Sequence, residues 1–249
     1  MFVYDLTAYF REDAENYDFT FHRYLTALSG NNQVIFETII VCGGEDFRVA
    51  RVTTPYMDSL DEKYDDIWVT QMKERLSEYL REPVAVTYIG EDYTYRDDCA
   101  TGKAAENYVL CIHPDMADLS PICCGHCRYN IPFYLLPPLS EQTREKLNSW
   151  HTVYTAYDKL FYATGIGEIS AHKMMCNISS PLNQSGLEVC RMLEKELGKP
   201  VYYYLYRFYG KQYRKCPICH AEWKHPEGNL YDYQCDNCRL VADKADMDH

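Results

Sequence analysis

Near its C-terminus the chain reads 216-CPICHAEWKHPEGNLYDYQCDNC-238. The cysteines follow the pattern C-x2-C-x15-C-x2-C, which is the spacing of a zinc ribbon built on four thiolates. Each C-x-x-C forms a tight turn that can aim two sulfurs at one tetrahedral ion. The segment between the turns has the length of a hairpin that brings them together. We therefore predict that one Zn²⁺ is bound by Cys216, Cys219, Cys235 and Cys238.

Four cysteine ligands leave zinc without an open coordination position, so such a site builds structure and does not activate water. The alternative, four free thiols in a small lobe, is unattractive because exposed thiols are reactive. The strongest motif thus favours a binding protein over a zinc enzyme. The sequence also contains no Gly-rich phosphate loop, G-x-S-x-G elbow or H-E-x-x-H helix, and we infer no small-molecule substrate from it.

The composition is that of a globular protein large enough for a main domain and an appendage. Of 249 residues, 47% are hydrophobic and 25% are charged, and 24 are tyrosines. Tyrosine buries a large ring and keeps a polar tip, so it suits interfaces as well as cores. This abundance indicates a contact surface, although most individual tyrosines are expected to pack.

Charge and cysteine content point to a cytoplasmic protein. Asp5 follows Met1-Phe2-Val3-Tyr4 directly, so we expect no secretory signal, and no apolar run approaches the 18 residues of a membrane span. Without export, the 12 cysteines fit metal ligation and buried single thiols better than a disulfide framework. We expect no membrane partner.

The net charge of −12 is concentrated in the first part of the chain. Residues 1–100 hold 9 Lys/Arg against 20 Asp/Glu, a net charge of −11. Such a surface repels nucleic acid and attracts cationic partners, unless it serves only as a solvated face.

Periodicity predicts an α+β protein in three segments. The first, 1–118, is an acidic mixed α/β domain. Its predicted elements are a strand at 2–10, a hairpin of 33–42 and 47–53 around Gly43–Asp46, a helix at 65–81 and strands at 84–89 and 108–112.

The second segment, 119–206, combines a Cys-containing loop with a helical region. Prolines punctuate 119–139, where a short hairpin or strand is expected at 131–136. A long helix should follow Ser140, and another should run from Pro181 to Leu197 with Gly198 as its end. A strand at 201–209 leads into the third segment, the zinc-ribbon β-hairpin lobe of 207–249.

A second C-x-x-C occurs at Cys124-Gly125-His126-Cys127. It matches the active site of thioredoxin-class disulfide isomerases, but no helix is expected after it to lower the thiol pKa. Together with Cys111 and His113, Cys124 and Cys127 could supply a second zinc site of the Cys3His type. The alternative is a turn whose thiols simply pack.

A basic and aromatic stretch leads into the ribbon. Cations for phosphates and rings for bases are what single-strand binding requires, and the alternative is a solvated hairpin face. The candidate nucleic-acid-binding residues are Arg207, Lys211, Arg214, Lys215, Trp223 and Lys224.

Four phrases together resemble a bacterial family of unknown function that is described as zinc-ribbon-containing and suggested to bind nucleic acid. They are Pro121-x-x-Cys124-x-x-Cys127, Ser180-Pro181-Leu182-Asn183-x-x-Gly186, Gly198 to Leu205, and the two ribbon turns with Arg239 and Leu240. The resemblance covers about residues 119–241 and implies that the four ribbon cysteines are zinc ligands. The chain departs from the usual ribbon turn at His220, where glycine is common, so strain from a positive φ is expected there.

We accordingly expect a non-enzymatic zinc-ribbon protein that binds a macromolecular partner. A basic protein bound through the acidic N-terminal half is the natural complement, and one form is an immunity or antitoxin protein that covers a toxin. The alternative is a nucleic-acid-binding protein that uses residues 207–224.

Overall fold

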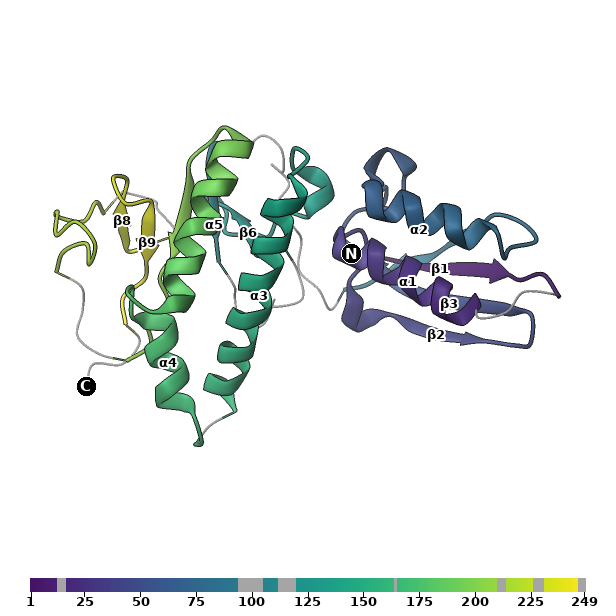
Figure 1. Cartoon of the computed structure of the whole chain (residues 1–249), viewed down its shortest axis with the longest axis horizontal. Coiled ribbons are helices and arrows are strands. Elements are labelled where there is room, and N and C mark those ends of the chain that lie inside the picture. The colour runs from purple at the N-terminus through teal and green to yellow at the C-terminus, as the bar shows by residue number, and fades with distance from the viewer. Residues whose placement is uncertain are drawn as a thin grey trace. The chain divides into compact units, whose positions relative to one another are not determined.

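The computed structural model describes residues 1–12, 17–93, 105–111, 120–163, 165–209, 214–225 and 231–245. The chain forms two compact units, which Figure 1 shows in a continuous colour series from the N- to the C-terminus. Unit 1 comprises Met1–Ala100, Asp118–Ser120 and Pro132–Leu135, and unit 2 comprises Thr101–Ala117, Pro121–Ile131 and Leu136–His249. The architecture is mixed α+β, as predicted, with one sheet in each unit.

Unit 1 has a four-stranded antiparallel sheet in the order β2-β3-β1-β4. Its chain order, β-α-β-β-α-β, is that of a split β-α-β fold. The elements are β1 (Phe2–Tyr9), α1 (Tyr17–Gly30), η1 (Phe36–Thr38), β2 (Ile40–Gly43), β3 (Phe47–Thr54), η2 (Glu62–Tyr64), α2 (Ile67–Ser77) and β4 (Ala85–Glu91).

Alternation along β1 explains how the core of unit 1 forms. Leu6 and Ala8 are fully buried, whereas Thr7 between them is only partly buried. The buried side chains pack with Phe21 of α1 and Leu76 of α2, so both helices cover one face of the sheet. The other face is not part of this core.

Most predicted elements of unit 1 are present, and two differ. The predicted strand at 33–42 begins only at Ile40, because Gln33, Val34 and Ile35 are all buried and so do not alternate as a strand would. Helix α1 was not predicted, although its buried residues Phe21, Tyr24, Leu25 and Leu28 have helical spacing.

Unit 2 has a five-stranded sheet in the order β6-β5-β7-β9-β8. The central pairs β5–β7 and β7–β9 are parallel, and the outer pairs β5–β6 and β8–β9 are antiparallel. The elements are β5 (Tyr108–Leu110), β6 (Ile122–Cys124), α3 (Glu141–Tyr162), α4 (Glu168–Cys176), α5 (Pro181–Leu197), β7 (Val201–Tyr204), β8 (Tyr233–Cys235) and β9 (Leu240–Ala242).

Helices α3, α4 and α5 pack against one another, and α5 packs on β7 (Figure 1). The predicted caps are present: Ser140 and Ser180 accept hydrogen bonds from the first turns of α3 and α5, and Gly198 ends α5 with a φ of 65°. Helix α4 was not predicted. Within 131–136 the structure has a 3₁₀ helix, η5 (Phe133–Leu135), instead of a strand.

Two residues of the phrase shared with the resembling family have structural roles. A Cβ atom on Gly186 would lie 2.2 Å from the ring of Tyr203, so only glycine lets α5 approach β7 this closely. The amide of Asn183 donates to the backbone carbonyls of Met175 and Asn177 at the end of α4 and accepts from the Tyr203 hydroxyl at 2.6 Å.

The observed division differs from the three predicted segments. Strands β8 and β9 of the last segment join the sheet that β5, β6 and β7 form, so residues 119–206 and 207–249 share one unit. Strand β5 also belongs to unit 2, which moves the main boundary from 118 to about 100. Among the described residues no helix has the length and apolar character needed to cross a bilayer.

Candidate metal centre

The centre is built on two tight turns that sit at the ends of short β segments. The first contains Cys216 and Cys219 and is closed by a hydrogen bond from the His220 N–H to the Cys216 carbonyl, with an N···O distance of 2.9 Å. The second contains Cys235 and Cys238 and connects β8 to β9.

In both turns the residue after the second cysteine has a left-handed backbone. His220 has a φ of 59° and Arg239 has a φ of 50°. This conformation is less stable by on the order of 1–2 kcal/mol for non-glycine residues. The expected positive φ at His220 is therefore present, and Arg239 repeats it in the second turn.

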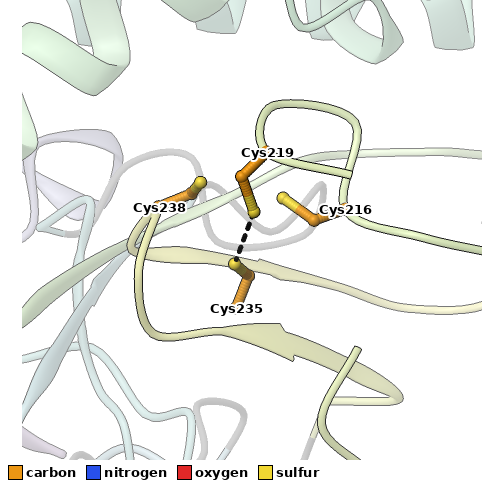
Figure 2. Close-up of side chains that lie close together, drawn as sticks. All are labelled: Cys216, Cys219, Cys235 and Cys238. Atoms are coloured by element: carbon orange, nitrogen blue, oxygen red, sulfur yellow. Dashed lines mark hydrogen bonds between the residues drawn. The ribbon is translucent and has the colours of Figure 1, made fainter. Parts of the chain in front are cut away.

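The two turns bring four sulfurs together (Figure 2). The Sγ atoms of the four cysteines all lie within 4.8 Å of one another, and those of Cys219 and Cys235 are 3.6 Å apart. Tetrahedral zinc with Zn–S bonds of about 2.3 Å would separate its sulfurs by about 3.8 Å. The cluster can thus hold a metal ion, and the donor set is that of a soft, thiophilic ion.

Burial and hydrogen bonding differ among the four thiols. Cys216 and Cys235 are buried, while Cys219 is exposed. The Ala221 backbone N–H, followed by the Cys238 thiol, lowers the pKa of Cys219 to about 7. Burial raises the pKa of Cys235 and of Cys238. Cys219 is therefore partly thiolate at neutral pH, the form that binds metal.

The cysteine cluster is fastened to the rest of unit 2 through the second turn. Arg239 binds Glu194 of α5 with its Nε and Nη2 atoms, at 2.9 Å and 3.2 Å, and its Nη1 donates to the Asp236 carbonyl. The Tyr203 N–H on β7 donates to the Arg239 carbonyl at 2.8 Å. Sequence reasoning did not identify Glu194, and it noted Arg239 only as part of the family-like phrase at the second turn.

Asp236, inside the second turn, gathers three further hydrogen bonds. Its carboxylate accepts from Gln234 at 2.6 Å, from Lys224, and from the Tyr202 hydroxyl at 2.9 Å. These bonds, Gln234 first, lower the pKa of Asp236 to about 2. The ionised carboxylate thereby links the turn to β7 at neutral pH.

The residues of the predicted second zinc site are not brought together in the described part of the chain. His113 lies outside the described residues, and Cys111 packs beside Cys123 in a buried cluster. Cys124 follows Cys123 on β6 and so points to the opposite face of the sheet. The metal-type group found among the described residues consists of the four C-terminal cysteines.

The turn at 124–127 nevertheless has the backbone of the other two. Arg128 has a φ of 64°, its N–H donates to the Cys124 carbonyl at 2.9 Å, and the His126 N–H donates to the Cys124 Sγ at 3.4 Å. The described residues that follow Cys127 do not form a helix, so the thiol-activating geometry of a disulfide isomerase is lacking there.

The candidate nucleic-acid-binding residues are spread over different environments. Trp223 is buried against Tyr233, with ring centroids 5.5 Å apart, so its faces are not open to a base. Lys215 pairs with Glu222 at 3.0 Å, and Lys224 pairs with Asp236. Arg214 is exposed, Arg207 is half-buried, and Lys211 lies outside the described residues.

Two family models match the chain, and both are described as domains of unknown function. DUF2310 matches residues 103–206 and DUF8594 matches residues 209–246. Neither description mentions zinc or nucleic acid. The matches support the resemblance to a family of unknown function over the region where the sequence indicated it.

Two uncharacterized proteins of Haemophilus influenzae are 27% identical to the chain over 161 residues, which is 62% of this chain. The alignment covers 61% of one relative and 78% of the other, so the chain spans about three-fifths of the first relative's length.

A solved structure described as "Putative antibiotic biosynthesis monooxygenase from Nitrosomonas europaea" aligns with 37% of this chain and 100% of its own. The identity is 12% and the TM-score is 0.32, a likeness that says nothing about activity.

Proposed function

We propose that the chain is a zinc-ribbon protein in which the four C-terminal cysteines bind one structural Zn²⁺. The observation that carries this proposal is the convergence of four sulfurs within 4.8 Å from two C-x-x-C turns. A second ion at Cys124 and Cys127 has less support, because their described neighbours do not complete a ligand set. With four thiolate ligands zinc keeps no open position, so the proposed role is binding and not catalysis.

Zinc would join parts of unit 2 that few backbone hydrogen bonds hold together. Among the described residues, the isolated bridge of Lys215 to Glu222 closes the first turn on itself, and the isolated bridge of Lys224 to Gln234 ties its end to β8. The second turn continues into β9, which pairs with β7. An ion held by both turns therefore cross-links the end of the chain to the sheet.

Metal analysis tests the zinc proposal directly. The purified full chain should contain one zinc per chain by inductively coupled plasma mass spectrometry, and Cys216→Ser should contain close to none. Cys42→Ser is the matched control, because Cys42 is an exposed thiol on β2 of unit 1 and is not one of the four clustered cysteines. Full zinc content in Cys216→Ser would refute the assignment, and two ions per chain would add the Cys124 turn.

We further infer that the acidic unit 1 binds a basic protein. Its cations are largely occupied: Arg48, Arg51, Lys63, Lys73 and Arg81 each form an ion pair with an acidic side chain of the same unit. Exposed carboxylates are left over, among them Glu74 and Glu78, one turn apart at the end of α2, and Glu82 just beyond.

Like charges four residues apart cost a helix a few tenths of a kcal/mol. A cationic partner would compensate this repulsion. The acidic surface would also attract such a partner over a distance and raise its association rate at low salt. An immunity or antitoxin protein that covers a basic toxin is one form of this proposal.

A pull-down from the native host at low and high salt tests the partner. We expect one basic protein that is retained at low salt and lost at high salt. The triple variant Glu74→Lys, Glu78→Lys, Glu82→Lys should lose it. A control with the same charge change in unit 2, Glu145→Lys, Glu188→Lys, Glu222→Lys, should retain it. Equal retention by both variants would contradict the proposal.

Nucleic-acid binding through residues 207–224 is the weaker alternative. Trp223 is buried, and Lys215 and Lys224 form ion pairs. Among the described candidates this leaves Arg214 as an exposed cation for which no ion pair is seen. The material that elutes in the pull-down decides between the two proposals. Nucleic acid without a stoichiometric protein would favour the alternative, and Arg214→Ala should then weaken the salt-dependent binding.

A further inference from the structure

Unit 1 contains a groove of about 870 Å³ that has no part in the proposed function. Side chains of α1, α2, β1 and β4 line it, together with the segments before α2 and before β4. Its volume lies within the range of about 300–1,000 Å³ that is typical of small-molecule sites. No motif in the sequence indicated such a site.

The walls of the groove are largely apolar. They include Leu6, Met57, Leu60, Leu76, Leu80 and Val86. Val86 pairs with Leu6 across β4 and β1, so both face the helical side of the sheet. Two wall residues are strongly exposed, Met57 at 60% and Val86 at 52%. Apolar side chains in this concave surface are open to water. Binding of an apolar molecule that covers them would lower the free energy of the system.

Hydroxyl groups interrupt these walls at Tyr4, Tyr24 and Ser77. Those of Tyr4 and Ser77 donate to the backbone carbonyls of Met57 and Glu74. Tyr24 of α1 lines the groove and is only 7% exposed. Among the described residues no hydrogen bond of its hydroxyl is found, and the hydroxyl oxygen stays accessible in the groove. The hydroxyl can therefore donate to a ligand oxygen there. Burial, then the carboxylates of Asp65 and Glu62, raise the pKa of Tyr24, and the hydroxyl stays protonated as a donor.

The charges at the rim do not favour an anionic ligand. Lys73 is neutralised by Glu62 at 2.7 Å and by Asp65 at 3.4 Å, and Arg81 is paired with Asp46 at 3.0 Å. The Nε of Arg11 donates to the Leu80 carbonyl. Asp61, Glu62 and Glu82 also line the groove. An anion would meet these carboxylates, whereas an uncharged molecule avoids the desolvation cost of a charge.

We propose that this groove is a binding site for an uncharged small molecule with an apolar body and one oxygen, a carbonyl or a hydroxyl, that accepts a hydrogen bond from Tyr24. The site is independent of the metal centre, because none of its lining residues belongs to unit 2. Glu82 belongs both to the groove and to the surface proposed for the basic partner, whereas Glu74 and Glu78 do not line the groove.

Nile red, an uncharged dye with a carbonyl group, is a suitable probe. A fluorescence titration of the full chain should give saturable binding of one dye per chain. Val86→Glu places a charge in the apolar wall and should weaken the dye affinity by about tenfold or more. Tyr24→Phe removes only the hydroxyl and should weaken it by about 3- to 10-fold.

Ile40→Glu is the matched control. Ile40 is 65% exposed on β2 of the same sheet but does not line the groove, so the dye affinity should be unchanged. Both glutamate variants replace exposed side chains, and circular dichroism verifies that they fold.

Three results would overturn the proposal: binding that does not saturate, equal weakening by Ile40→Glu and Val86→Glu, or no effect of Tyr24→Phe. Sedimentation velocity adds a fourth. If Val86→Glu converts a dimer into a monomer, a second copy of the chain covers the groove and the small-molecule site is refuted.

Discussion

The sheets of the two units are held together by different means. In unit 1, β1 and β3 are 8 residues long and β4 is 7, and the three pair almost along their full length under a continuous apolar core. In the described part of unit 2 each strand has only 3 or 4 residues. Few backbone hydrogen bonds connect these strands, so interactions between side chains must contribute more to the stability of this sheet. The cysteine cluster, the Arg239–Glu194 ion pair and the bonds of Asp236 are concentrated there.

This difference predicts in which unit the loss of one side chain should reduce stability more. A long, registered sheet over a core tolerates the removal of a surface contact, whereas a sheet of short strands depends on each link. Hydrogen exchange, which reports protection segment by segment, can measure the two units separately.

The largest effect is expected from the loss of a metal ligand. Cys216→Ser should lose zinc and lower the unfolding free energy of unit 2 by on the order of 3–5 kcal/mol, because structural zinc binding is folding energy. Cys42→Ser in unit 1 should change neither. Hydrogen exchange with zinc analysis checks both. Equal loss of protection in residues 17–93 would show that the two units do not unfold separately.

Each unit contains an ion pair between an arginine and a carboxylate, and the two pairs have similar geometry. Arg239 and Glu194 in unit 2 form a two-pronged pair, as do Arg51 and Asp5 in unit 1. Arg239→Ala also removes the bond to the Asp236 carbonyl and should cost unit 2 about 1 kcal/mol, since both partners are partly exposed and screened. Arg51→Ala should have a smaller effect on unit 1, measured by urea unfolding. A larger effect at Arg51 would reverse the comparison.

Acidification should also weaken unit 2 selectively, through His172. Its Nε2 accepts the backbone N–H groups of Phe208 and Tyr209, at 3.2 Å and 3.1 Å, which requires a neutral ring. Burial, followed by Arg207, lowers the pKa of His172 below its usual value near 6.5. The folded state therefore binds this proton less readily than the unfolded state. Stability is complete above about pH 6.5 and declines as the pH falls below it.

We expect unit 2 to be less stable at pH 5.5 than at pH 7.5, and the difference should be smaller in His172→Gln, which cannot titrate. Urea unfolding with excess zinc is the measurement, and zinc content is verified at each pH because thiolates also titrate. An unchanged pH dependence in His172→Gln would assign the effect to other groups.

The smallest expected effect is a gain. His220 pays for a left-handed backbone that glycine adopts freely, so His220→Gly should stabilise unit 2 by about 0.5–1 kcal/mol. Ala221→Gly, next to it, should be neutral or destabilising because it only adds unfolded-state entropy. Thermal unfolding of the zinc-loaded chain compares the two, and a loss of stability in His220→Gly would mean that the imidazole makes a contact of its own.

Local signals account for what the sequence predicted well. The caps Ser140 and Ser180, the glycine at 198 and the cysteine spacing each act within a few residues, so α3, α5 and the convergence of the four sulfurs could be predicted. Helix α4 lacked such a signal, since it begins after Gly167, with no side-chain cap, and is only 9 residues long.

The arrangement of unit 2 could not be predicted in the same way. The parallel pairing of β9 with β7 joins residues far apart in the chain, and no local pattern encodes it. The same holds for the groove of unit 1, whose lining residues come from several elements and from the segments that connect them. The cysteine pattern identified which residues meet, but not the sheet to which their turns are attached.

The strand order of unit 2 has a consequence for the synthesis of the protein. Strand β5 is made early, yet its neighbour β7 begins at Val201, and the sheet is complete only when β9, ending at Ala242, has emerged from the ribosome. Nearly all of unit 1 precedes residue 100 and can fold while translation continues. The short strands and buried thiols of unit 2 must wait for the last cysteines, so this half of the nascent chain is the one that would need a chaperone's protection.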